Sequence, residues 1–189
     1  MRDKIRNVSI QLFDEKGYSE TSIQDIVEAL GVTKGTFYYY YKSKQELLTQ
    51  IHLTYIEYLL DEQEKILQDE KKTYKEKLYN NILLVIKSIR PERQSARIFM
   101  REMRHLKKGN LEMIKEKRDA FRINTQTIIE KGIEEGEFTS EMRPNLVTFG
   151  ILGLTNWSYY WFQPDGEVSE EELASEYMQF ILHGISNKT

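Results

Sequence analysis

Residues 12–48, LFDEKGYSETSIQDIVEALGVTKGTFYYYYKSKQELL, decide the fold of the N-terminal part of the chain. Within them, one helix face is built from apolar residues spaced i, i+3, i+4 and i+7, namely Ile23, Ile26, Val27 and Leu30. Gly31 follows, and glycine adopts the left-handed backbone that a tight turn requires, after which Val32 returns to the core. Two short helices joined through a glycine at this spacing predict a helix-turn-helix.

The helix that follows the turn carries residues suited to reading DNA. Thr33 is expected to cap it, with Phe37 and Tyr41 one turn apart on the buried side. The four tyrosines 38–41 cannot all be buried, because a helix rotates by about 100° per residue. Lysine donates to guanine or phosphate, and hydroxyl groups bond to bases or phosphates, so the outward face fits a major groove. That face comprises Lys34, Thr36, Tyr38 and Tyr39, with Tyr40 at its edge.

Two neighbouring positions extend this surface. Gly35 allows the backbone to approach DNA closely, and Lys44 lies in the first turn of the next helix, whose amide-rich start favours a phosphate. The alternative interpretation is that the tyrosines are half-buried packing residues and that the lysines are only solvated.

The rest of the chain also has helical patterning. It holds only three prolines and no run with the alternation of a half-buried strand, so we expect an all-α fold of about nine helices. Ser/Thr-x-x-Glu/Gln capping boxes are expected at Thr21–Gln24, Ser43–Glu46, Thr73–Glu76 and Ser169–Glu172. Breaks are expected at Gly17–Tyr18, Gly31–Val32, Arg90–Pro91, Lys108–Gly109, Gly136–Pro144 and Gln163–Gly166.

The apolar stripes widen from Tyr74 onward, which is typical of helices that bury one face in a bundle. We therefore expect a three-helix head over residues 1–47 and a helical bundle over residues 48–189. Leu146–Phe162 is apolar nearly all round but shorter than the ~20 residues of a membrane span, so we interpret it as a buried helix. The last helix, expected to end at Gly184, has an apolar face that serves as core or as a subunit interface.

The composition limits the classes of function. The net charge of −3 means that DNA binding must come from a local surface. The lack of cysteine excludes disulfides and cysteine zinc sites, and Met1–Gly17 has no signal-peptide core, so a cytoplasmic location is expected. His52, His105 and His183 lie far apart, and no phosphate loop or nucleophile elbow is present. We expect no enzyme activity, no metal site and no cofactor.

Residues 5–48 as a whole resemble the DNA-binding region of the TetR (tetracycline-repressor) family, through Leu12-Phe13, Gly17-Tyr18, Gly31-Val32 and the runs 34–38 and 41–48. Val27, Leu30 and Ser9 replace alanines that are common there, which changes packing but not the DNA-facing residues. The resemblance implies base contacts by Thr33, Lys34, Thr36 and Tyr39, and phosphate contacts by Tyr38, Lys44 and either Thr21 or Ser22.

The resemblance also implies a ligand-responsive repressor that forms a homodimer through its last two helices and binds a near-palindromic operator. Asn156–Gly166, NWSYYWFQPDG, resembles a subgroup linked to fatty-acid and sterol catabolism, in which acyl-CoA thioesters release the repressor. Arginines at i, i+4 and i+7 on one helix face would take the CoA phosphates, and Met and aromatic residues would take the acyl chain. The candidates are Arg97, Arg101 and Arg104, and then Phe99, Met100, Met103, Phe121, Trp157 and Trp161.

Alternatives remain open for each of these residues. Arginines beside Glu102 are also typical of a solvated, ion-paired face, and the tryptophans of core or dimer contacts. A drug-like molecule or a free lipid is the alternative effector, and a protein partner is the alternative to any small molecule. A non-specific architectural DNA binder is a further rival.

Overall fold

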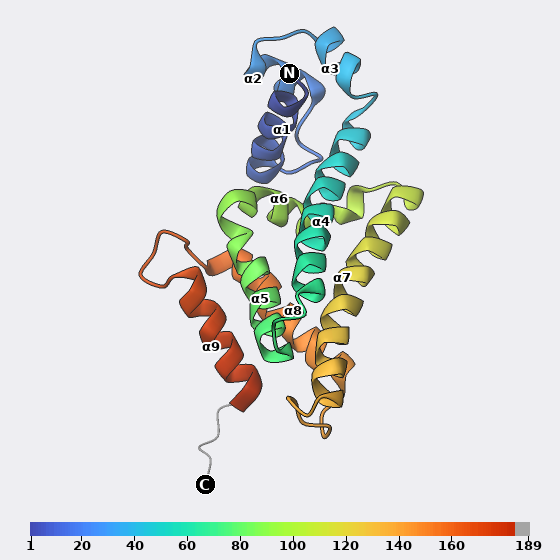
Figure 1. Cartoon of the computed structure of the whole chain (residues 1–189). Coiled ribbons are helices and arrows are strands. Elements are labelled where there is room, and N and C mark those ends of the chain that lie inside the picture. The colour runs from blue at the N-terminus through green and yellow to red at the C-terminus, as the bar shows by residue number, and fades with distance from the viewer. Residues whose placement is uncertain (184–189) are drawn as a thin grey trace. The chain divides into compact units, whose positions relative to one another are not determined.

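The computed structural model describes residues 1–183, which form nine α-helices and one short 3-10 turn, with no strand among them (Figure 1). This confirms the predicted all-α class; the predicted helix end at Gly184 lies outside the described residues. The helices are α1 (Arg2–Lys16), α2 (Ile23–Leu30), α3 (Lys34–Tyr40), α4 (Lys44–Gln68), α5 (Tyr74–Lys87), α6 (Ile89–Arg101), α7 (Lys108–Glu134), α8 (Pro144–Trp161) and α9 (Glu170–His183), with η1 (Met103–His105) between α6 and α7. No described helix is long and apolar enough to cross a membrane.

The chain forms two compact units. The first comprises Met1–Glu57 and Glu92–Lys117, and the second comprises Tyr58–Pro91 and the chain from Arg118 onward. Helices α4, α6 and α7 each contribute residues to both units. The predicted boundary at residue 47, between a DNA-binding head and a helical bundle, stays a prediction. The two compact units divide the chain at other residues and so do not test it.

The first unit contains the predicted helix-turn-helix, with α1, α2 and α3 around a core that includes Ile5, Phe13, Ile26 and Phe37. Gly31 ends α2 with φ +64°, the left-handed backbone expected of it. Thr33 caps α3 through a bond from the Thr36 amide, as predicted.

The cap of α2 differs from the predicted box at Thr21–Gln24. Ser22 is the N-cap, and it exchanges hydrogen bonds with Asp25, which lower the pKa of that carboxyl. Thr21 is fully buried, and its hydroxyl donates to the carbonyl oxygens of Gly17 (2.9 Å) and Leu12 (3.2 Å). Only Thr21 matched the Ser/Thr-x-x-Glu/Gln pattern, since Ser22 is followed three residues later by Asp25; burial of Thr21 in the preceding turn shifted the cap by one residue.

The other boxes follow the prediction more closely. Thr73 and Glu76 form the complete reciprocal box at the start of α5. Ser43 accepts a bond from the amide of Glu46, whose carboxylate accepts from the amide of Lys42 rather than from Ser43. The break expected at Arg90–Pro91 is a helix end at Lys87 followed by a kink at Glu92 (φ −120°, ψ 18°) inside α6.

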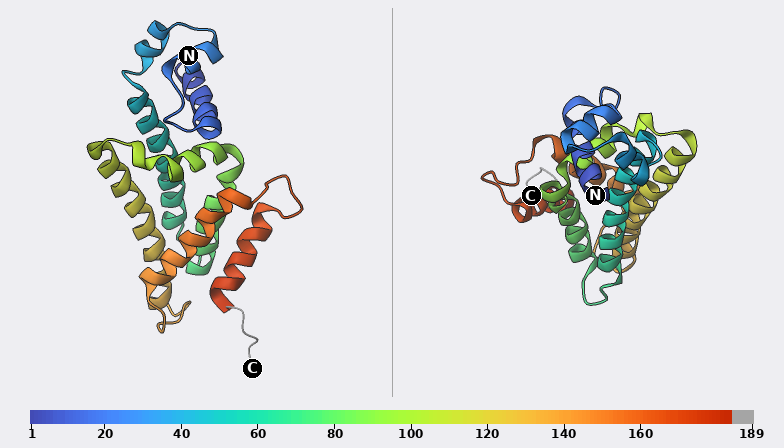
Figure 2. Two further views of the ribbon diagram at one scale, coloured as in Figure 1. Left: turned by 180° about the vertical axis from the view of Figure 1, so that it is seen from behind. Right: turned by 90° about the horizontal axis from the view of Figure 1, so that it is seen from above.

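In the second unit, α5 packs against both α8 and α9 (Figures 1 and 2). Ile82, Ile86 and Tyr159 are buried there, and the Tyr159 hydroxyl lies 3.1 Å from the Ser88 hydroxyl. The connection between α8 and α9 is tied to this core by Arg90, which donates to the carboxylates of Asp165 (2.6 Å) and Glu170 (2.9 Å).

Helix α8 is not buried all round, contrary to the prediction. Ile151, Thr155 and Tyr159 face the core, but apolar side chains on the opposite face are exposed. Hydropathy alone made both faces appear equally suited to burial, whereas α8 buries only the face that packs against α5, from which the Ser158 hydroxyl also contacts that of Tyr177 on α9 (2.8 Å).

The left-handed turn at Gly31 leads to a first prediction. A β-carbon at φ +64° is strained, so Gly31→Ala should lower the free energy of unfolding by about 1–2 kcal/mol. Urea denaturation followed by circular dichroism, at one fixed protein concentration, measures this change. Gly109→Ala is the matched control, since its added β-carbon meets nothing within 4 Å and its φ is not positive. Equal losses in the two variants would contradict the assignment of strain to Gly31.

Candidate functional site

Helix α3 presents its polar face outward because its opposite side is anchored. Phe37 is fully buried, and Tyr41, the C-cap residue, is 2% exposed with its ring centroid 5.9 Å from that of Phe37. The rotation of the helix then leaves Tyr39 80% exposed and Tyr38 53% exposed. The predicted division of the four tyrosines into inward and outward positions is therefore observed.

The start of α3 is accessible as well. Thr33, Lys34 and Gly35 are exposed, whereas Thr36 is half-buried, with its hydroxyl 3.2 Å from that of Thr33. Lys34 forms no ion pair with any described residue. The first turn of α3 thus offers a free ammonium group, hydroxyls and an open backbone position on one surface, next to the two exposed tyrosines.

Two predicted phosphate-contact residues make hydrogen bonds within the unit: Thr21, which is buried, and Lys44, which is half-buried. The Lys44 ammonium donates to the carbonyl oxygens of Tyr18 (2.7 Å) and Thr21 (2.6 Å) and lies 4.2 Å from the centre of the Tyr18 ring. Burial lowers the pKa of Lys44. Thr21 is buried, while Ser22 is exposed, so the structure favours Ser22 of the two alternatives for a phosphate contact.

An ion-pair cluster that the sequence did not single out joins α1 to α6 within the first unit. The Asp14 carboxylate, with a side chain 6% exposed, accepts bonds from Arg97 and, at 3.4 Å, from Arg101. Arg101 also donates to the backbone oxygen of Asp14 at 3.0 Å. Asp14 lies 83 residues from Arg97 in sequence, so no local sequence pattern could predict this ion pair.

The three arginines predicted on one helix face do not share a helix. Helix α6 ends at Arg101, and Arg104 lies on η1, where its Nε donates to the ring of His105 (3.2 Å). Gln45 of α4 donates to the backbone oxygen of His105 and fixes this turn. That tertiary contact interrupts the regular i, i+4, i+7 spacing from which the shared face was predicted.

The apolar effector candidates fall into different environments. Phe99 is buried in the first unit, with its ring centroid 5.2 Å from that of Tyr55, and Phe121 is buried in the second. Met100 and Met103 are half-buried. Trp157 and Trp161 are exposed instead, at 64% and 47%, so neither is enclosed by this chain.

These tryptophans belong to an exposed apolar face that runs the length of α8. Its members are Leu146, Phe149, Trp157, Tyr160 and Trp161. Gly150 and Gly153 lie along the same face, and a β-carbon added at either would meet no atom within 4 Å. Phe180 of α9 is also half exposed. Exposed apolar surface of this extent is typical of a protein contact.

The second unit also contains a buried polar cluster that the sequence analysis missed. The Gln63 amide nitrogen donates to Asn81 Oδ1 (2.8 Å), Thr125 Oγ1 (3.1 Å) and the Phe121 carbonyl oxygen (3.1 Å). That carbonyl only accepts, so it fixes the orientation of the Gln63 amide. Gln63 Oε1 is then a buried acceptor with no donor among the described residues, which costs about 1–3 kcal/mol unless a water or a ligand supplies one.

Over residues 1–183, no three histidine, aspartate or glutamate side chains come together in an arrangement that would hold a metal ion. The arrangement that the structure does provide is a short, anchored helix with an exposed polar face, a polar acceptor buried among apolar helices, and an exposed apolar stripe.

Comparison with known proteins adds independent information. The model of the family described as "Bacterial regulatory proteins, tetR family" matches residues 5–51, and "Tetracyclin repressor-like, C-terminal domain" matches residues 71–185. The HTH-type transcriptional repressor KstR2 of Mycolicibacterium smegmatis is 23% identical over 186 residues, covering 98% of this chain and 90% of that protein.

Two solved structures share the whole fold. The TetR family transcriptional regulator PfmR from Thermus thermophilus is 31% identical with a TM-score of 0.89, covering 97% of this chain and 99% of that one. AibR, solved in complex with isovaleryl coenzyme A and operator DNA, is 22% identical with a TM-score of 0.84, covering 96% and 97% of the two chains.

Proposed function

The chain belongs to the TetR family of bacterial transcriptional regulators, and we propose that it is a homodimeric repressor released from its operator by a fatty acyl-CoA. Each protomer inserts α3 into the major groove, and two-fold symmetry requires a near-palindromic operator. Effector binding favours a state in which the two heads no longer match the half-sites. It does so only to the extent that the effector binds the two states with different affinity, typically by ~1–3 kcal/mol.

The observation that carries the DNA-binding role is the anchored presentation of α3. Burial of Phe37 fixes which side chains face outward, and these are Lys34, Tyr38 and Tyr39. Lysine and tyrosine supply the donors that base edges and phosphates accept. The exposed first turn of α3 lets the backbone at Gly35 approach the DNA.

The exposed apolar face of α8 supports the homodimer. Leaving Trp157, Tyr160 and Trp161 in water is unfavourable, and two copies of one face bury each other in a two-fold contact. Gly150 and Gly153 permit the two backbones to approach closely. This assigns Trp157 and Trp161 to the dimer contact in place of the effector site.

Two observations support an acyl-CoA as the effector. The fold is shared with AibR, whose structure contains isovaleryl coenzyme A. The unpartnered acceptor of Gln63 lies among apolar helices, and the amide and hydroxyl groups of a pantetheine arm are donors that suit such a site. Phe121 belongs to the same unit as Gln63 and remains a candidate for contact with this ligand, whereas Phe99, Met100 and Met103 belong to the first unit.

Within the first unit, Arg97 and Arg101 are separate candidates for binding an anionic group. Arg97 and Arg101 already hold Asp14 at the end of α1. A CoA phosphate that bound these guanidinium groups would compete with the Asp14 carboxylate, since phosphate also accepts from arginine through two parallel bonds. Loss of the Asp14 contact would loosen α1, which packs against α2 of the helix-turn-helix.

The DNA-binding role predicts sequence-specific binding that depends on α3. The probe is a duplex selected by the wild-type protein from a random library, compared with a scrambled duplex in fluorescence anisotropy at fixed salt. Lys34→Ala and Tyr39→Ala should each weaken binding to the selected duplex by about 1–3 kcal/mol and reduce the preference over the scrambled one.

The control for these variants is Lys108→Ala, an exposed lysine at the start of α7, which should leave both affinities unchanged. Equal affinity of the wild-type protein for the two duplexes, with the same steep salt dependence, would instead identify a non-specific binder.

The effector proposal predicts that acyl-CoA thioesters release the protein from the selected duplex. Isovaleryl-, octanoyl- and palmitoyl-CoA are added in turn, with free CoA as the control, and binding stoichiometry is read by native mass spectrometry. At least one thioester should raise the Kd for the duplex about tenfold, as a coupling of ~1.4 kcal/mol implies. A protein that stays free of every thioester would refute the acyl-CoA assignment and leave DNA binding intact.

The dimer proposal predicts that a charge on the α8 face separates the protomers. Trp157→Glu should convert the dimer to a monomer in size-exclusion chromatography with light scattering, because a carboxylate is costly to bury without a partner. Tyr58→Glu alters an exposed aromatic residue on α4 and should leave the dimer intact. Persistence of the dimer in Trp157→Glu would exclude this face.

A further inference from the structure

We propose that Arg2 and Lys4, in the first turn of α1, bind phosphates of the operator beside the groove that α3 enters. The inference rests on the proposed DNA-binding function and extends its contact surface to a helix outside the helix-turn-helix pair. Neither residue belongs to the stretch 5–48 from which the DNA contacts were predicted.

Arg2 is held at the C-terminal end of α3. The Tyr41 hydroxyl donates to the backbone oxygen of Arg2 at 3.4 Å, and the Arg2 guanidinium lies 5.5 Å from the centre of the Tyr41 ring. Tyr41 is itself fixed, because it is the buried C-cap residue of α3. The position of Arg2 is therefore coupled to the same anchor that orients the DNA-reading helix.

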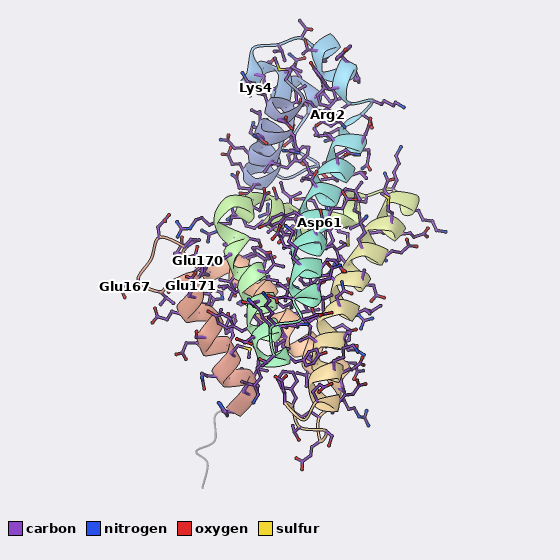
Figure 3. All side chains as sticks on the ribbon, in the orientation of Figure 1. Arg2, Lys4, Asp61, Glu167, Glu170 and Glu171 are labelled. Carbon is purple, nitrogen blue, oxygen red and sulfur yellow. The ribbon has the colours of Figure 1, made fainter. Side chains whose placement is uncertain are left out.

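Figure 3 shows Arg2 and Lys4 at the end of the first unit where α2 and α3 lie. Both side chains are exposed. Because they project from a helix that packs against α2, their positions are set by the fold and not by a flexible arm.

The charges around these residues leave them available. Asp3 lies next to both in sequence, but its carboxylate is directed to Arg6, at 3.5 Å. Neither Arg2 nor Lys4 forms an ion pair with a described residue. Other cations already have partners, since Arg90, Arg97 and Arg101 bind carboxylates and Lys44 binds two carbonyl oxygens.

The negative net charge of the chain makes the positions of its unpaired cations important for DNA binding. A chain with a net charge of −3 repels DNA unless free cations gather where the DNA lies. Together with Lys34, Arg2 and Lys4 supply such cations around α3. The homeodomain, which is another three-helix DNA-binding domain, likewise uses residues N-terminal to its first helix to contact DNA next to the groove that its third helix reads.

The experiment is a measurement of Kd against salt concentration for the selected duplex. Each phosphate neutralised on B-DNA contributes about 0.9 to the slope of log Kd against log salt concentration. Arg2→Gln and Lys4→Gln should each reduce that slope by about 0.9, and should weaken binding to selected and scrambled duplexes alike. Lys131→Gln removes an exposed positive charge from α7 and should leave the slope unchanged.

A second readout separates a phosphate contact from a general effect of charge or of altered folding. The selected duplex is shortened stepwise from both ends. At some length, wild-type binding should weaken and its salt slope should fall. The double variant Arg2→Gln/Lys4→Gln should not respond to that step, because it has already lost the phosphate contacts that the shortening removes. Thermal unfolding at fixed protein concentration confirms that the variants are folded.

Unchanged slopes in both single variants, or equal sensitivity of wild type and double variant to shortening, would overturn the inference. Failure of the wild-type protein to prefer the selected duplex is a separate result, which would count against the proposed function itself.

Discussion

Burial of Phe37 is the constraint on which the DNA-facing surface depends. Helix α3 is seven residues long, and a helix of that length is not stable in water without tertiary contacts. Phe37, together with Tyr41 at the C-cap, supplies those contacts and fixes the rotation of the helix. Everything exposed on α3 follows from that rotation, and so does the position of Arg2, which bonds to Tyr41.

A second constraint is the distribution of charge in a chain that is negative overall. Several cations bind partners within their own unit: Lys44 closes the connection between α1 and α2, Arg97 and Arg101 hold α1 through Asp14, and Arg90 holds the start of α9. The cations on the first unit that form no ion pair with a described residue include Lys34, Arg2 and Lys4. The division between structural and free cations, more than their number, determines where a polyanion is attracted.

Two features of the second unit depart from the usual arrangement, in which polar groups face water and apolar side chains are buried. The Gln63 side-chain oxygen is buried with no donor among residues 1–183, while an aromatic stripe on α8 faces water. Both features cost free energy in an isolated protomer, and under the proposed function both are relieved, in one case by a donor-bearing ligand and in the other by a second protomer. A ligand and a second protomer are also the two partners that the resemblance to the TetR family implies.

The sequence by itself determined the all-α class, the turn at Gly31, the cap at Thr33 and the inward or outward position of each tyrosine in residues 38–41. These features are local, since they depend on helix periodicity and on the backbone preferences of a few adjacent residues. The same reasoning failed where a distant residue intervened. Burial of Thr21 moved the cap of α2 to Ser22, and Gln45 held the turn that separates Arg104 from α6.

Only the tertiary structure decided which apolar face of α8 is covered, that Lys44 is engaged by carbonyl oxygens, and that Asp14 is the partner of Arg97. It also brought Gln63 to Asn81 and Thr125, from three different helices. The physical reason is that hydropathy and charge report what a side chain can do, whereas the partner it finds depends on the long-range packing of helices. No periodicity within one helix records that packing.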